Sequence, residues 1–234
     1  MALFEKKTCS VCGGKIGLMG NRKLDDGNMC KDCASRISPF FADRRRTTLA
    51  DMLEHLAQRD ANLAKVAEFN PTRSFGDRTK LHLDDGAGRF IVTSSNRWAG
   101  ENPDVIELSQ VTGCRVDVRE NKTELKTKDA DGKSVPYVPP RFEMYYDYDV
   151  VILINSPWFS EIRLRVNRGD VRRGSPDVKE CELECERIRA ALSREAPDAS
   201  PAPSRTAQVC PHCGATCVPD ARGLCEYCGG AMGG

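Results

Sequence analysis

The chain contains 234 residues, of which 40% are hydrophobic, and its 35 Lys and Arg residues offset 34 Asp and Glu residues to a formal net charge of +1. This composition supports a folded core, and at this length we expect one or two domains. The near-zero charge argues against a protein that binds nucleic acid or membranes mainly by electrostatic attraction, and the sequence has no run of about 20 apolar residues that would span a bilayer.

The 12 cysteines are concentrated at the two ends of the chain. Four lie in the first 33 residues and five in the last 25, whereas the long middle contains only Cys114, Cys181 and Cys185. The segment Met1–Lys7 is too short and too charged for a secretory signal, so we expect a cytoplasmic protein, in which disulfides rarely persist. Paired CxxC motifs in that setting indicate metal sites.

Residues 1–45 are predicted to form a zinc module. Two CxxC pairs separated by 17 residues supply four thiolates, Cys9, Cys12, Cys30 and Cys33. Each pair can place both sulfurs on one ion, and two pairs complete the tetrahedron of a closed structural Zn²⁺ site. Gly20-Asn21 and Asp26-Gly27 predict a hairpin between the pairs, and a helical turn can follow the second pair. This order is typical of treble-clef or LIM-like modules; the alternative, a redox CxxC motif, would not need a second matched pair.

A connecting helix is predicted within residues 46–72. Thr47 or Thr48 can cap its start, and Asn70-Pro71 ends it. Its apolar residues recur at helical spacing: Leu49, Met52, Leu53, Leu56, Leu63 and Val66. This stripe is expected to pack on the zinc module, on the middle domain or on a second copy of the chain, since about three heptads also permit a coiled-coil dimer. Arg44–Arg46 are interpreted as a solvated helix start in preference to a phosphate contact, and no role is assigned to His55.

In residues 73–194 apolar and polar residues alternate along much of the chain, and this spacing predicts a β domain. We expect about six or seven antiparallel strands with one buried face within residues 80–166, the longest of them over residues 146–154. Glu120-Asn121 is interpreted as a turn between strands. A C-terminal helix is predicted to start at Ser175-Pro176, and the three cysteines of this region are expected in the core.

The tail is divided into a linker, residues 195–207, and a zinc ribbon, residues 208–234. Three prolines and small polar residues predict an extended tether. The pattern CxxCG-x10-CxxCG supplies a second set of thiolate ligands, Cys210, Cys213, Cys225 and Cys228. His212 and Cys217 are further potential ligands, either of which could replace one of the four. We expect this module to depend on its metal for folding, because so short a segment buries little apolar surface.

Two resemblances together cover nearly the whole chain. Asp104–Gly113, where a strand leads into a turn, and Pro157–Val166, before the final helix, resemble the pleckstrin-homology-like barrel. The phrases Cys12–Gly17, Asp26–Cys33 and Tyr137–Pro140 resemble a bacterial family that has an N-terminal zinc domain and no assigned activity. These resemblances imply an α+β fold: an antiparallel β-barrel or sheet capped by a C-terminal helix and flanked by two small zinc modules.

The sequence shows no catalytic constellation. It lacks a glycine-rich phosphate loop and a GxSxG elbow, and four cysteines are expected to fill each zinc site, which leaves no open position for a substrate. Asp84-Asp85, Asp147 and Asp149 are interpreted as solvated carboxylates at turns or strand edges. We therefore do not expect an enzyme.

The interpretation that the sequence favours is a zinc-stabilised protein-interaction or adaptor protein with two structural zinc ions. An unidentified protein partner would contact the β domain and the tethered ribbon, and linking two weak contacts raises the overall affinity. Exposed aromatic residues are the candidate anchors: Trp98, Trp158 and Phe159. Their alternative role is to fill the interior of the β domain.

Two alternative partners are nucleic acid, bound through the zinc modules, and anionic lipid, bound through the β domain. A basic stretch that includes Arg163, Arg165 and Arg168 suggests both. Eight zinc-bound thiolates would bring the net charge to about −3, which disfavours both anionic partners. Homo-oligomers are compatible with the sequence, which does not fix the number of chains.

Overall fold

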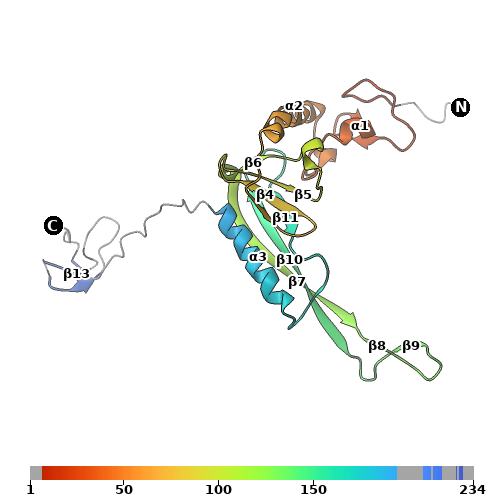
Figure 1. Cartoon of the computed structure of the whole chain (residues 1–234). Coiled ribbons are helices and arrows are strands. Elements are labelled where there is room, and N and C mark those ends of the chain that lie inside the picture. Colours follow the sequence, from red (N-terminus) through yellow and green to blue (C-terminus); the bar gives the residue numbers. More distant parts are fainter. Residues whose placement is uncertain (1–6, 194–207, 212, 218–224, 226, 229–234) are drawn as a thin grey trace. The chain divides into compact units, whose positions relative to one another are not determined.

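The computed structural model describes residues 7–193, 208–211, 213–217, 225 and 227–228. The chain forms two compact units, Met1–Ser193 and Arg194–Gly234 (Figure 1). The linker predicted at residues 195–207 lies outside the described residues. None of the described helices is long and apolar enough to cross a membrane.

The first unit begins with a small module around a two-stranded hairpin. β1 (Arg22–Lys23) pairs antiparallel with β2 (Asn28–Met29), and the short helix α1 (Lys31–Ala34) follows. Leu24 and Met29 are fully buried and form the centre of this module's core. A hairpin and then a helical turn are the order that the sequence predicts.

Helix α2 (Leu49–Ala67) connects this module to the β domain. Thr48 caps its first turn, since its Oγ1 accepts a hydrogen bond of 3.2 Å from the Asp51 N–H. The buried face of the helix is only partly the predicted apolar stripe, because Leu53 and Leu63 are 45% and 53% exposed. The buried face instead contains two polar residues, His55 and Arg59, and both find partners outside the helix.

The β domain consists of two open antiparallel sheets of four strands each. The first sheet has the order β3 (Arg73–Phe75), β4 (Lys80–Asp84), β5 (Arg89–Thr93) and β6 (Ile106–Glu107). In the second sheet β10 (Phe142–Ile154) pairs with all the others: β7 (Val111–Glu124), β11 (Glu161–Arg165) and β12 (Val171–Arg172). The prediction of antiparallel strands is confirmed. A closed barrel, one of its two alternatives, is not seen in the part of the chain that the structure describes.

Helix α3 (Asp177–Leu192) runs alongside β7 and β10 (Figure 1) and completes the core of this domain. Its buried Cys185 and Ile188 pack in the same cluster as the inward side chains of both sheets. Cys181 is also buried there, and Cys114 packs against the cluster from β7. The predicted core role of these three cysteines is confirmed.

A long two-stranded arm extends from the second sheet (Figure 1). β7 and β10 stay paired from Val111–Ile154 out to Glu124–Phe142, and the hairpin of β8 (Lys126–Lys128) and β9 (Ser134–Pro136) forms its tip. The predicted turn at Glu120-Asn121 is wrong, because both residues lie within this ladder. On the outer part of β7, from Arg119 to Glu124, polar side chains occupy both faces, so the alternation that reveals a half-buried strand is missing there, whereas β10 keeps it through Phe142, Met144 and Tyr146.

A buried ion pair holds the helix against the β domain. The Arg59 Nη1 lies 2.7 Å from the Asp104 Oδ1, and only 8% and 11% of the two side chains is exposed. The Ser38 hydroxyl donates to the other carboxylate oxygen at 2.7 Å. Because Ser38 lies in the N-terminal module after α1, Arg59 lies on α2 and Asp104 precedes β6, this one carboxylate joins three parts of the first unit.

Asp104→Asn is expected to lower the free energy of unfolding by about 3 kcal/mol, because Arg59 would keep its charge without a counter-charge. Urea unfolding of the zinc-loaded protein measures the effect. Asp60→Asn is the matched control: it removes the carboxylate of the exposed pair with Arg36 and should cost less than about 1 kcal/mol. Equal losses for the two variants would show that the buried pair has no special role.

Candidate metal centres and interaction groove

The first candidate metal centre brings together the four N-terminal cysteines that the sequence predicts. The sulfurs of Cys9, Cys12, Cys30 and Cys33 all lie within 4.8 Å of one another. The Cys9–Cys33 and Cys12–Cys30 Sγ···Sγ distances are 3.9 and 3.8 Å. Zinc–sulfur bonds of about 2.3 Å in a tetrahedron require sulfurs about 3.8 Å apart. The cluster therefore has the dimensions of a four-thiolate zinc site.

The local backbone prepares these sulfurs to act as thiolates. Gly13, at φ +71°, lets the chain turn back after the first pair, so that its N–H donates to the Cys9 carbonyl at 2.8 Å. The Cys30 N–H donates to the Cys9 Sγ at 3.2 Å, and the Cys33 N–H donates to the Cys30 Sγ at 3.4 Å. Burial raises the pKa of Cys9, but backbone N–H donors outweigh it and bring that pKa down to about 6. A ligand thiol with this pKa loses its proton readily to a metal.

The second candidate centre repeats this geometry in the second unit. The sulfurs of Cys210, Cys213, Cys225 and Cys228 also lie within 4.8 Å of one another. The Cys210–Cys228 and Cys213–Cys225 Sγ···Sγ distances are 3.6 and 3.7 Å, again close to the zinc value. Gly214 has φ +73°, and its N–H donates to the Cys210 carbonyl at 2.9 Å, as Gly13 does to Cys9.

The strands β13 (Gln208–Val209) and β14 (Thr216–Cys217) pair beside this second cluster. They place the Cys217 Sγ 3.5 Å from the Cys225 Sγ, yet Cys217 is not one of the four mutually close sulfurs. The backbone N–H of Cys228 is the largest cause of a Cys225 pKa lowered to about 6. His212, the other potential ligand, lies outside the described residues. Each of the two four-cysteine groups could hold a structural zinc ion.

Residues 8–55 match the family model described as "Domain of unknown function (DUF4428)". The match contains the first four-cysteine cluster and ends within α2, so the likeness applies to the N-terminal module. No curated protein and no solved structure matches the chain.

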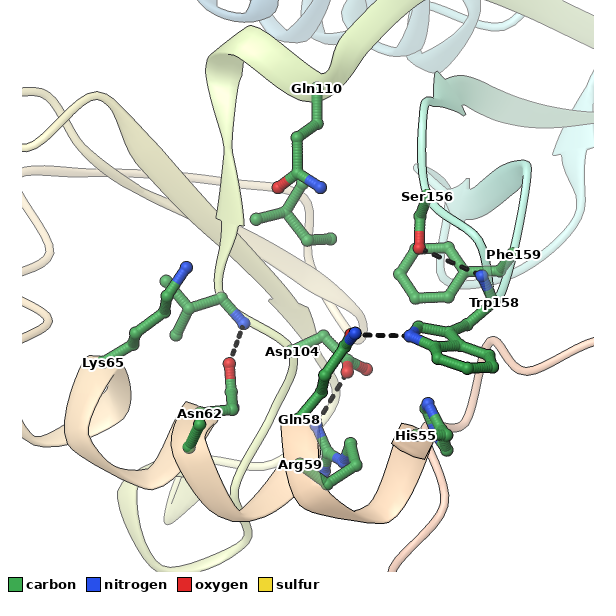
Figure 2. A pocket seen from close by; sticks show the side chains of 13 residues that line it. His55, Gln58, Arg59, Asn62, Lys65, Asp104, Gln110, Ser156, Trp158 and Phe159 are labelled. Atoms are coloured by element: carbon green, nitrogen blue, oxygen red, sulfur yellow. Dashed lines mark hydrogen bonds and ion pairs between the residues drawn. The ribbon is translucent and has the colours of Figure 1, made fainter. Parts of the chain in front are cut away.

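A groove with a volume of about 280 Å³ lies between α2 and the β domain (Figure 2). Trp158 forms one wall, and its indole N–H donates to the Gln58 Oε1 at 2.6 Å. Phe159 also lines the groove but is mostly buried, with its ring 5.6 Å from that of Phe40. Trp98 packs edge-on against Phe69 in a separate cluster. The structure thus brings two of the three candidate aromatic anchors together.

The basic residues predicted to meet an anionic partner are largely neutralised. Arg165 contacts Asp149 at 2.5 Å and Asp147 at 2.8 Å, and Arg163 contacts Asp117 at 3.0 Å. Asp149 is 2% exposed and forms ion pairs with three arginines, and Asp84 is 4% exposed and pairs with Arg89. The interpretation of these two residues as solvated carboxylates is therefore wrong. The outer face of the second sheet carries a matched set of four arginines and four carboxylates: Arg115, Arg119, Arg163, Arg165, Asp117, Asp147, Asp149 and Glu161. Arg168 is exposed and has no ion pair with a described residue.

His55 is a residue whose role the sequence did not reveal. Its Nε2 accepts the Ser38 N–H at 3.1 Å, and its ring packs against those of Phe41 and Trp158, with centroid distances of 4.6 and 5.0 Å. Burial, and secondly the charge of Arg59, lower the pKa of His55 to about 4. The only signal in the sequence is its helical spacing from Met52 and Arg59 on the buried face.

The zinc-loaded protein is expected to contain two zinc ions per chain. Cys12→Ser should reduce that number to one, because a four-thiolate site loses affinity for zinc when one ligand is removed. Elemental analysis combined with native mass spectrometry measures the ratio. Cys185→Ser, which alters a buried core cysteine of α3, should retain both ions. A wild-type ratio below two would contradict the assignment of one cluster.

The neutral state of His55 predicts a specific loss of stability in acid. The unfolded chain binds a proton at this side chain below about pH 6.5, whereas the folded protein binds it only near pH 4, so the free energy of unfolding falls as the pH drops between these values. Between pH 6.5 and 5 this contribution is about 2 kcal/mol. His55→Gln keeps an acceptor for the Ser38 N–H but cannot titrate, and denaturant unfolding at several pH values should show a shallower dependence. A pH dependence of His55→Gln as steep as that of the wild type would contradict the neutral, buried state of this side chain.

Proposed function

We propose that this protein is a non-enzymatic, zinc-stabilised adaptor that binds a protein partner through the groove beside Trp158. The groove is the observation that carries the proposal. Tryptophan is enriched in the energetically dominant centres of protein interfaces, because it buries a large apolar area while its N–H stays paired. Here the indole already has its partner in Gln58, so binding would cost little reorganisation.

The walls of the groove are fixed before any partner arrives. The Asn62 Oδ1 accepts the Val105 N–H at 3.0 Å (Figure 2), as its dashed line shows. The Gln110 Oε1 accepts the Glu107 N–H at 3.0 Å. Lys65 and Glu107 form an exposed ion pair at the rim, 3.1 Å apart. An aromatic wall with a charged and amide-bearing rim suits a polypeptide segment, whose main chain offers donors and acceptors to the rim while an apolar side chain packs on the indole.

A structural role for both metals supports the non-enzymatic part of the proposal. Four cysteine sulfurs complete the tetrahedral shell of a zinc ion, so no coordination position would remain for a substrate or an activated water. The zinc ions would instead stabilise small modules that bury little apolar surface.

The pleckstrin-homology-like assignment belongs to the same proposal, as do a bacterial origin and a cytoplasmic location. Two antiparallel four-stranded sheets followed by a C-terminal helix support this fold relationship. The second unit, with its zinc ribbon, would add a second weak contact and increase the total affinity for one partner. Nucleic acid and anionic lipid are less well supported as partners, because Arg163 and Arg165 already pair with carboxylates.

Quantitative affinity capture with the full zinc-loaded chain tests the proposal. A true partner should lose at least about tenfold in recovery with Trp158→Ala or Gln58→Ala, the loss expected when an interface anchor is removed or its support is deleted. Trp98→Ala, the control on the other aromatic cluster, should retain it. Zinc content and thermal unfolding verify that each variant is folded. If no captured protein distinguishes the groove variants from the control, the groove is not the contact surface.

A further inference from the structure

A second concave site lies on the N-terminal module, and it shares no lining residue with the groove and includes none of the four cysteines. It has a volume of about 420 Å³, and we name it the cationic pocket after its charged lining residues Lys23, Arg44 and Arg45. Asn21, Leu24 and Asp25 complete its lining. Neither the zinc sites nor the proposed adaptor role uses any of these side chains.

Local hydrogen bonds bring the two sides of the pocket together. The Asp25 N–H, at the turn of the β1–β2 hairpin, donates to the Thr47 carbonyl at 3.0 Å. The Leu49 N–H donates to the Asp26 Oδ1 at 2.7 Å and ties the start of α2 to the same turn. Arg44 and Arg45 lie on the single 3-10 turn Arg44–Arg46 that enters α2, so these bonds place them across from Lys23.

The cations of this pocket lack the counter-charges that arginines have elsewhere in the protein. Among the described residues, no carboxylate lies within ion-pair distance of Arg22, Lys23, Arg44 or Arg45, in contrast to the fully matched arginines of the second sheet. Burial, together with the positive charges of Arg22 and Arg45, lowers the pKa of Arg44. Residues 7–48 contain nine Lys and Arg residues but only four Asp residues, although the whole chain is nearly neutral. Uncompensated positive charges at short range favour the binding of an anion.

A buried oxygen at the same site narrows the kind of anion. The Asn21 Nδ2 donates to the Asn28 Oδ1 at 2.9 Å, but the Asn21 Oδ1 is buried and has no hydrogen-bond partner in the described part of the chain. An unpaired buried acceptor is costly, and a ligand that carries a hydroxyl group can satisfy it. Inorganic phosphate near neutral pH combines negative charge with a P–O–H donor, whereas sulfate has no proton to donate.

We propose that the cationic pocket is a binding site for inorganic phosphate. The guanidinium groups of Arg44 and Arg45 and the ammonium of Lys23 would donate charge-assisted hydrogen bonds to its unprotonated oxygens. Because the Asn21 Oδ1 has almost no accessible surface, this side chain would turn towards the pocket to accept a hydrogen bond from the phosphate hydroxyl. Asp25 in the lining disfavours a fully deprotonated polyanion and so adds to the preference for a protonated ligand.

Calorimetric titration of the zinc-loaded full chain with inorganic phosphate, at low ionic strength, tests the site. We expect saturable binding of one phosphate per chain. The double variant Arg44→Gln/Arg45→Gln should weaken it by at least about tenfold, since each lost charge-assisted hydrogen bond contributes roughly that factor or more. The matched control Arg168→Gln/Arg173→Gln removes two exposed arginines without ion pairs among the described residues, and it should bind phosphate as the wild type does. Zinc analysis after the titration confirms that phosphate has not removed the metal.

Three results would overturn the proposal. The first is the absence of saturable phosphate binding by the wild type. The second is equal weakening in the pocket variant and in the control, which would show that the arginines are merely solvated. The third is equal affinity for sulfate, which would exclude the role of the ligand hydroxyl.

Two further binding measurements test the role of Asn21 and the identity of the anion. Asn21→Ala should reduce the preference for phosphate over sulfate, and an unchanged preference would remove Asn21 from the site. A short DNA duplex should bind no more tightly than phosphate itself; tighter binding that needs Arg44 and Arg45 would identify a nucleic-acid backbone as the ligand in place of free phosphate.

Discussion

The Asp104 carboxylate is the point at which the parts of the first unit are joined. It receives Arg59 from α2 and Ser38 from the segment after the first four-cysteine cluster. Burial of a carboxylate is costly unless its oxygens are paired, and here both of them are. Removing any one of the three parts would leave a charge or a hydroxyl unpaired in the interior. The zinc module, the connecting helix and the β domain are therefore expected to keep a fixed relation, and the groove beside Trp158 exists because they do.

Local sequence patterns predicted the parts of this protein that depend on local chemistry. The eight thiolate ligands are fixed by CxxC spacing, and the start of α2 is fixed by the Thr48 cap; both patterns act within a few residues. His55, Arg59 and Asp104 could not be found in this way, because their partners are up to 66 residues distant in the chain. A polar residue on an apolar helix face looks like an irregularity until the element that pairs with it is known. The outer part of the arm was missed for a different reason: both faces of β7 are polar from Arg119 to Glu124, so no alternation of apolar residues marks that half of the strand.

Charge is distributed differently on the two halves of the first unit. The second sheet places its arginines opposite aspartates, so the basic stretch around Arg163 and Arg165 is nearly neutral in the fold. The N-terminal module keeps Arg44 and Arg45 without such partners. The stretch that includes Arg163 and Arg165 was the one predicted to meet an anionic partner, whereas it is Arg44 and Arg45 that form no ion pair among the described residues. The difference follows from strand pairing, which sets residues of opposite charge beside each other across β7, β10 and β11.

The arm also bears on the tendency of the protein to aggregate. β7 has 14 residues and pairs only with β10 among the described strands, so one long edge of backbone donors and acceptors remains available for pairing with another chain. Exposed edges of this length are hazardous unless the sequence blocks association. Arg119, Glu120, Lys122 and Glu124 place charged groups along the outer half of that edge. A second strand that approached in most registers would bring some like charges together, and this repulsion opposes edge-to-edge association.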